Sequence, residues 1–262
     1  MAKEVADKRA DKEKKKKPKE DPTASMSVVD HLRELRDRLI WSILAIAIGA
    51  IICFIFFGPI IHLMVGPYRD ATVSKAFPNG KALIFTGPLE AFTTRIKVAA
   101  YGGLIIASPV VFFHLWRFIT PGLNPKEKRY AIPFTVSSVI LFAGGSVVAV
   151  FTFPKALQFL LSVGGRELDP LLSAGSYLTL VFLMILAFGV SFEFPIVMMF
   201  LLLSRVVTTQ TLRKTRKYTF LGIVIFAAVI TPSQDPISLF AMAVPMYLLF
   251  EITILIGRIL KR

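Results

Sequence analysis

Six apolar runs alternate with polar segments along the chain. They cover about residues 39–57, 98–116, 130–153, 177–203, 218–230 and 237–256. Most of them have the roughly 20 residues that a helix needs to cross the hydrocarbon core of a bilayer. Since 55% of the residues are hydrophobic and only 18% are charged, several segments require a non-aqueous environment. The pattern predicts an all-α polytopic membrane protein with six transmembrane helices.

The basic residues indicate how these helices are oriented. The formal net charge is +14, and the lysines and arginines gather in an N-terminal tail and in short segments between apolar runs. Because basic residues favour the cytoplasmic side of a membrane, both termini are predicted to be cytoplasmic. The segment 58–97 also holds basic residues, but it is long, and long loops count less, so we place it outside. The charge therefore reflects orientation in lipid and not nucleic-acid binding.

The first residues differ in composition from the rest. Residues 1–24 hold mixed charge, two prolines and almost no large apolar side chains. Such a segment cannot bury enough apolar surface to offset its conformational entropy. We predict a disordered basic cytoplasmic tail over residues 1–24, without the features of a cleaved signal peptide, and a membrane domain over residues 25–262.

The last two runs predict short spans. From Tyr218 to Ile230 there are about 13 residues, which as a helix reach about 20 Å. The sixth run pairs with this one across a tight turn, and Glu251 and Arg258 limit its apolar length. Short fifth and sixth spans would thin the bilayer beside them. As an alternative, the fifth span begins earlier, among basic residues from Arg213 onward that snorkel to the surface.

The fourth run carries a carboxylate, Glu193, near its middle. It lies ten residues before Leu203, about 15 Å from the predicted cytoplasmic end of the helix. A charge at that depth costs roughly 2.5–3.5 kcal/mol on insertion scales, so it should face the bundle or a water-filled recess. Pro195 is predicted to bend the helix, and Gly189 to leave space on the same face. Glu193 is a candidate functional residue, with satisfaction by neighbouring helices as the structural alternative.

Two predicted cytoplasmic segments carry candidate anions. In residues 25–41 an apolar stripe predicts a helix that lies at the membrane surface and runs into the first span. Its Glu34 either forms an ordinary ion pair with Arg38 or offers a carboxylate to a ligand. After the second run, an Asn-Pro pair favours a helix start, where Glu127 either completes a capping box or binds a cationic ligand.

The sequence contains no recognisable catalytic or metal-binding motif. His31, His62 and His114 lie far apart, and the single cysteine, Cys53, lies inside an apolar run. A zinc-protease motif, a nucleophile elbow and a phosphate-binding loop are all missing. The small residues Gly144 to Ser146 fit close helix packing better than catalysis. We therefore predict a protein that is not an enzyme and that needs no metal or other cofactor.

Four motifs taken together resemble a known family. They are HLRELRDRL, FHLWRFITPGLNPKEKR, FGVSFEFP and AVPMYLLFE. In order and spacing they are similar to TatC, the multispanning receptor of the twin-arginine protein translocase. The resemblance implies a concave, glove-like bundle in a bacterial plasma membrane that binds paired-arginine signal peptides and exports folded proteins by the proton-motive force. It also implies single-span partners of the TatA and TatB type and self-association within the complex.

The resemblance also assigns roles to individual residues. The implied signal-peptide-binding residues are Glu34, Arg36, Phe118 and Glu127. Glu193 is implied to contact a partner helix or the inserted signal, and Pro67 and Asp235 to serve in outer loops. Because a guanidinium can bond one carboxylate through two hydrogen bonds, a pair of exposed glutamates suits an arginine pair.

A proton-coupled secondary transporter is the alternative function. A carboxylate beside a helix break is typical of such proteins. This function predicts two similar halves and a pair of broken helices, and the sequence shows no such repeat. An intramembrane enzyme is less favoured, because no nucleophile and base occur at useful spacing.

Overall fold

The computed structural model describes residues 28–73, 82–119, 131–163 and 172–260, and the tail predicted over residues 1–24 lies outside them. Its helices are α2 (Val28–Ile55), α3 (Phe57–Thr72), α4 (Glu90–Ile119), α5 (Ala131–Val163), α6 (Ala174–Ser191), α7 (Phe194–Leu203), α8 (Thr209–Lys214), α9 (Arg216–Ile230) and α10 (Pro236–Ile259). The chain divides into two compact units, residues 1–37 and 38–262.

Five membrane-length helices occur in the described part of the chain. They are α2, α4, α5, the apolar stretch of α6 with α7, and α10. They match five of the six apolar runs and confirm an all-α membrane protein with several spans. The other run is α9, whose 15 residues are fewer than a typical span needs. α9 begins at Arg216, so the alternative of an earlier start among basic residues holds for Arg216 and Lys217. A turn at Thr215 separates α9 from α8, so the start does not extend back to Arg213. The count of six spans, the orientation and the glove-like shape stay predictions.

The expectation of a short sixth span is wrong. α10 has 24 residues and is long and apolar enough to cross a bilayer. Glu251 does not end the apolar helix, because its carboxylate accepts hydrogen bonds from Arg216 of α9 and from Tyr247, one turn earlier on α10. A paired charge is tolerated within a membrane helix far better than an isolated one.

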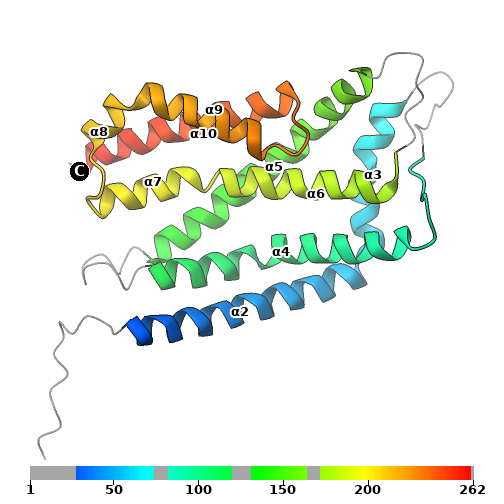
Figure 1. The fold of residues 1–262 in the computed structure, drawn as a ribbon, viewed down its shortest axis with the longest axis horizontal. Helices are drawn as coiled ribbons and strands as arrows, with labels where there is room; N and C mark the ends of the chain where they lie inside the picture. The colour runs from blue at the N-terminus through cyan, green and yellow to red at the C-terminus, as the bar shows by residue number, and fades with distance from the viewer. Residues whose placement is uncertain (1–27, 74–81, 120–130, 164–171, 261–262) are drawn as a thin grey trace, which may run out of the picture. The chain divides into compact units, whose positions relative to one another are not determined.

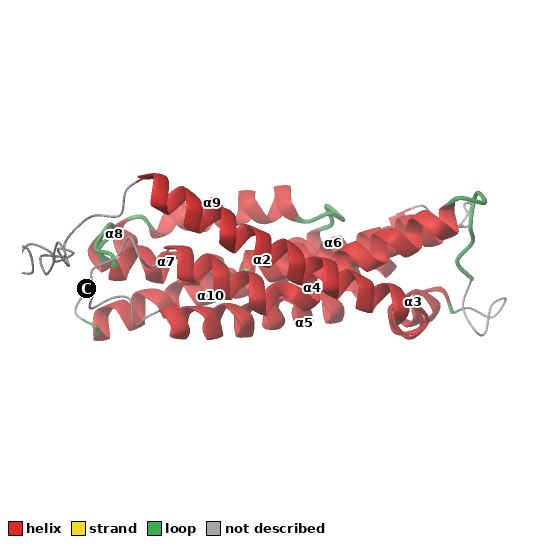
Figure 2. Ribbon diagram, turned by 90° about the horizontal axis from the view of Figure 1, so that it is seen from below, coloured by secondary structure: helices red, strands yellow, loops and turns green. Residues whose placement is uncertain are grey.

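The long helices of the second unit pack closely on one another. α4, α5 and α6 are mutual neighbours, and α10 packs on α5, α7 and α9 (Figure 1 and Figure 2). A Cβ added at Gly145 would lie 2.5 Å from the carbonyl oxygen of Phe188, and one added at Gly49 would lie 2.7 Å from that of Gly103. These contacts confirm the predicted close packing at Gly145, whereas a Cβ added at Gly144 meets nothing within 4 Å.

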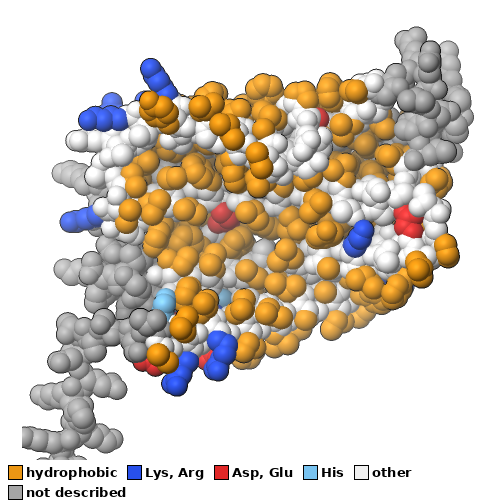
Figure 3. Space-filling view, in the orientation of Figure 1, with side chains coloured by type: hydrophobic (Ala, Val, Ile, Leu, Met, Phe, Trp, Pro, Cys, Tyr) orange, Lys and Arg blue, Asp and Glu red, His pale blue; other side chains and the backbone are white. Residues whose placement is uncertain are grey.

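The largest buried cluster lies where α5, α6 and α10 meet. Its members include Phe153, Tyr177, Phe188, Met242 and Phe250, all nearly inaccessible. Hydrophobic side chains also cover most of the surface seen in Figure 3, whereas charged side chains are few there and lie mostly toward its edges. A bundle that is apolar inside and outside fits lipid as its solvent.

Helix α3 is absent from the predicted elements. It crosses the end of the bundle where α4 and α6 begin, at a steep angle to the long helices (Figure 1 and Figure 2). The hydroxyl of Tyr177 in α6 donates a hydrogen bond to the carbonyl of Met64 at 2.7 Å, and its ring lies 5.3 Å from that of Tyr68. Pro67, expected in an outer loop, lies inside this helix and is half-buried.

Candidate functional site

The helix of the fourth apolar run is interrupted at Phe192 and Glu193, between α6 and α7 (Figure 1). Pro195 has no backbone N–H, so it cannot donate to the carbonyl of Ser191 as a helical residue would. Just before it, the N–H of Glu193 donates to the carbonyl of Val190 at 3.0 Å, three residues back and not four, so the chain turns more tightly here. The break that Pro195 predicts is therefore present, with Glu193 at its centre.

Glu193 is half-buried, and one of its carboxylate oxygens, Oε1, is buried without a hydrogen-bond partner among the described residues. The hydroxyl of Ser138 in α5 interacts with the carboxyl group. Ser138 Oγ in turn accepts a hydrogen bond from Nε1 of Trp116 in α4, at 2.7 Å. Three helical segments thus contribute to one polar chain. Because a buried oxygen without a donor is costly in a membrane, the arrangement favours a ligand or partner that supplies one.

Aromatic rings enclose this polar chain. The rings of Trp116 and Phe134 stack at 4.7 Å between centroids, and Phe200 of α7 lies 5.7 Å from Trp116. The space predicted beside Gly189 is filled, because a Cβ added there would lie 2.6 Å from a ring carbon of Phe142. That prediction is wrong: the glycine admits an aromatic ring from α5. The ring packing holds the tryptophan, which bonds Ser138, in one arrangement.

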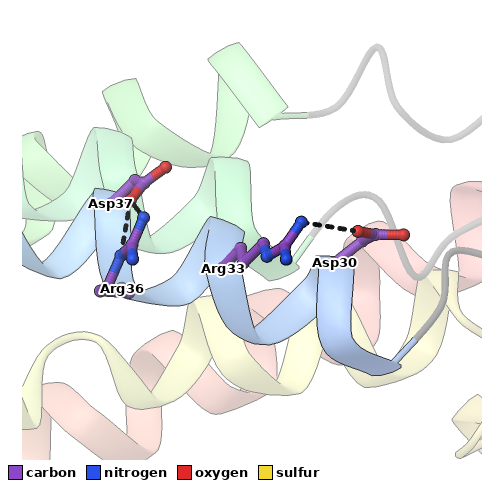
Figure 4. Close-up of polar contacts among 4 residues, drawn as sticks. All are labelled: Asp30, Arg33, Arg36 and Asp37. Carbon is purple, nitrogen blue, oxygen red and sulfur yellow. Dashed lines mark hydrogen bonds and ion pairs between the residues drawn. The ribbon is translucent and has the colours of Figure 1, made fainter.

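Glu34 and Arg36 lie in the first turns of α2, within the first unit. Glu34 Oε2 is 3.9 Å from His31 Nδ1, and its side chain is 20% exposed. The neighbouring charged side chains form further local pairs, Arg33 with Asp30 and Arg36 with Asp37 (Figure 4). The Arg36 guanidinium donates to Asp37 Oδ1 through Nε and Nη2 at 2.9 and 2.8 Å. The role of these two residues in binding an arginine pair stays a prediction.

Three other predicted site residues lie elsewhere. Phe118 lies in the last turn of α4 and is partly buried. Glu127 lies outside the described residues. Asp235 is the N-cap of α10 and is almost fully buried, with Oδ1 accepting the N–H of Ser238 at 2.8 Å and Oδ2 accepting the hydroxyl of Ser233. Capping accounts for the aspartate at this position.

Sequence reasoning misses a second carboxylate that joins helices. Glu90, at the start of α4, accepts hydrogen bonds from the N–H of Gly175 in α6 at 3.0 Å and from the hydroxyl of Thr86 at 2.7 Å. An acidic residue in the first turn of a helix is a recognisable signal. The sequence gives no signal for its partner Gly175, which lies 85 positions away. No group of three or more metal-binding side chains occurs among the residues that the structure describes.

Comparison with known proteins gives a consistent result. The family model described as Sec-independent protein translocase protein (TatC) matches residues 30–245. The TatC protein of Frankia casuarinae is 42% identical over 238 residues, which are 88% of this chain but 65% of that relative, so the chain spans less than two thirds of its length. The TatC protein of Aquifex aeolicus is 39% identical, with 90% of this chain and 97% of the relative covered.

A solved structure shares both fold and sequence with this chain. It is the crystal structure of the twin-arginine translocase receptor TatC, with a TM-score of 0.71 and 38% sequence identity. The match covers 88% of this chain and all of that one.

Proposed function

The chain belongs to the TatC family of Sec-independent protein translocase proteins, and from this premise we propose that it is the core receptor of a twin-arginine translocase. The family match over residues 30–245 is the observation that carries the proposal. In this role the protein recognises a peptide and catalyses no reaction. It acts in a bacterial plasma membrane, with six spans, a concave bundle and both termini in the cytoplasm.

The paired arginines of a signal peptide dock on Glu34 and Glu127, with Arg36 and Phe118 beside them. Each guanidinium can make two hydrogen bonds to a carboxylate, and a lysine makes only a point contact. The helical setting of Glu34 supports this role, because the residue lies within α2 and not in a loop. A carboxylate held on a stiff helix loses little entropy on binding.

The apolar part of the signal, or a helix of a TatA or TatB type partner, packs toward Glu193. A polar side chain on that helix donates a hydrogen bond to the carboxylate. The buried Oε1, which lacks a partner among the described residues, supports this step. Several copies then assemble with the partners, and folded cargo crosses the membrane at the expense of the proton-motive force.

The alternative of a proton-coupled secondary transporter is not favoured. It rests on a carboxylate beside a helix break, a feature that receptor and transporter share. The match to a translocase family over most of the chain adds weight to the receptor alone.

Signal-peptide affinity tests the proposal. We would measure binding of a peptide with two arginines, and of the same peptide with two lysines, to the purified protein and to Glu34→Gln and Glu127→Gln. The expected loss is about tenfold or more for either variant, because hydrogen bonds to a charged group contribute about 1.5–3 kcal/mol. Asp30→Asn, one turn from Glu34 on the same helix, is the matched control and should leave the affinity unchanged. Equal binding of both peptides to all four proteins would contradict the receptor assignment.

A further inference from the structure

A cavity of about 390 Å³ lies under α3, between that helix and the first turns of α4 and α6. Its wall is mainly apolar and includes Phe57, Ile61, Val65, Leu83 and Leu178. Leu178 precedes Glu193 by about four helical turns. The cavity is therefore separate from the polar chain around Glu193.

The cavity follows one row of side chains along α3. Phe57, Ile61 and Val65 succeed one another at intervals of four residues, and Arg69 continues the same row. From the first to the last of these residues a helix rises roughly 18 Å. A space of this volume spread over that length is too narrow for a helix, which is about 10–12 Å across. It suits a single hydrocarbon chain with a cation at one end.

Arg69 supplies a cation on the cavity wall. The guanidinium of Arg69 makes no ion pair within the described part of the chain, and His62 lies in the same wall. Thr94 also lines the cavity, but its Oγ1 is buried away from the open space. An occupant that brings an anionic group to Arg69 is therefore favoured.

These features point to one class of ligand. We propose that the cavity binds one acyl chain of an anionic phospholipid, with Arg69 at the phosphate. A phospholipid presents an acyl chain and a phosphate at its two ends, which matches the apolar row and the cation that continues it. Each CH₂ that leaves contact with water is favourable, and a cation near an anionic headgroup adds to binding.

The surroundings of the cavity fit the edge of a membrane. α3 lies steeply across the ends of α4 and α6 (Figure 1). The guanidinium of Arg95 lies 4.3 Å from the ring centre of Phe54 and 5.3 Å from that of Phe57, which lines the cavity. Aromatic and basic side chains together are typical of the headgroup region.

Photocrosslinking tests the proposal. The full chain would be placed in nanodiscs that contain phosphatidylglycerol and phosphatidylcholine, with a trace of either lipid carrying a photoreactive group on its acyl chain. Mass spectrometry would then locate the adducts. We expect adducts of phosphatidylglycerol concentrated on the residues that line the cavity. Adducts spread evenly over the lipid-facing surface of the long helices would overturn the proposal.

A matched pair of glycine variants separates this cavity from ordinary lipid contact. Gly58 lines the cavity and Gly66 does not, and a Cβ added at either meets nothing within 4 Å. Gly58→Leu should fill the cavity and lower the cavity adducts about fivefold, because the lipid's acyl chain loses its apolar contacts with the cavity wall. Gly66→Leu, on the same helix, should leave them at the wild-type level. Equal adducts in the two variants would show that no chain enters the cavity.

The headgroup is tested at Arg69. Arg69→Gln should reduce the preference for phosphatidylglycerol over phosphatidylcholine to about parity while acyl adducts remain, because it removes the charge and keeps much of the side chain. An unchanged preference would overturn the assignment of Arg69 to the phosphate. Neither readout depends on signal-peptide binding, so the lipid site and the receptor function are tested separately.

Discussion

The carboxylates of Glu251 and Glu193 both lie along apolar segments of this protein, and their surroundings differ. Glu251 on α10 accepts hydrogen bonds from Arg216 and from Tyr247. Glu193, in the break between α6 and α7, interacts with Ser138, yet its Oε1 is buried without a partner among the described residues. One charge is neutralised inside the fold, and the other is only partly satisfied.

The difference separates a structural charge from an available one. The Arg216–Glu251 pair fastens α9 to α10, and removing either partner leaves an uncompensated charge in an apolar setting. Glu193 occupies a helix break beside a cluster of aromatic rings, and the fold itself bears the cost of a half-satisfied carboxylate. Such a cost is expected where a partner helix completes the hydrogen bonding.

The largest expected effect comes from removing the available carboxylate. In Glu193→Leu, binding of a TatA or TatB type partner in nanodiscs should fall about 10–100-fold, since a hydrogen bond to a charged group contributes about 1.5–3 kcal/mol. The free energy of unfolding should stay level or rise. Glu251→Leu is the contrast and should lower stability while partner binding is preserved. If Glu193→Leu lowered only stability and Glu251→Leu lowered only partner binding, Glu251 would be the carboxylate available to a partner.

Close packing of α5 on α6, near the break, gives the next effect. Gly145→Ala places a methyl group against the carbonyl oxygen of Phe188 and should destabilise the protein by about 1–3 kcal/mol. Denaturant unfolding in detergent micelles measures this change. Gly144→Ala, where a Cβ meets nothing within 4 Å, is the control and should be neutral or slightly stabilising. Similar losses for both variants would point to a general intolerance of side chains in this turn.

Breaking the satisfied pair should have a smaller effect. Arg216→Met should lower the free energy of unfolding by about 1–2 kcal/mol, near the upper end for polar contacts between membrane helices. The double variant with Glu251→Leu should recover most of that loss, because no unpaired charge remains. A double variant as unstable as the sum of both single variants would show that the pair does not couple α9 to α10.

The smallest effect is expected at the hydroxyl between Trp116 and Glu193. Ser138→Ala removes the acceptor of the indole N–H and should cost about 0.5–1 kcal/mol in unfolding free energy. It should also weaken partner binding slightly, since the carboxylate is less well held. Ser137→Ala, at an exposed neighbouring position, is the control. Identical results at both positions would remove Ser138 from the site.

The long helices could be predicted because their signal is local. An apolar run of membrane length needs no tertiary information, and Pro195 alone predicts the break at Glu193. α3 could not be predicted, because its sequence has the glycines and prolines that are typical of a loop, at Gly58, Pro59, Gly66 and Pro67. This helix is fixed by contacts from α6, such as the bond of Tyr177 to Met64.

The candidate site was predictable only in part, because some of its residues are brought together by contacts between helices that the sequence does not show. Glu193 is conspicuous within an apolar run. Ser138, which interacts with it, and Trp116, which bonds Ser138, come from other helices and carry no signal of their own. The short sixth span was an error, since the sequence does not show that Arg216 neutralises Glu251. The filling of the space at Gly189 by Phe142 likewise depends on how α5 meets α6.

The end of the bundle beside α3 joins segments that leave the ribosome at different times. Glu90 bonds Gly175, 85 positions later, and the carbonyl of Met64 bonds Tyr177, 113 positions later. Because a chain is synthesised from its N-terminus, α3 and the start of α4 are inserted before α6 exists. This end of the molecule can mature only late in biogenesis, and a chain that stops between α5 and α6 leaves both contacts unmade.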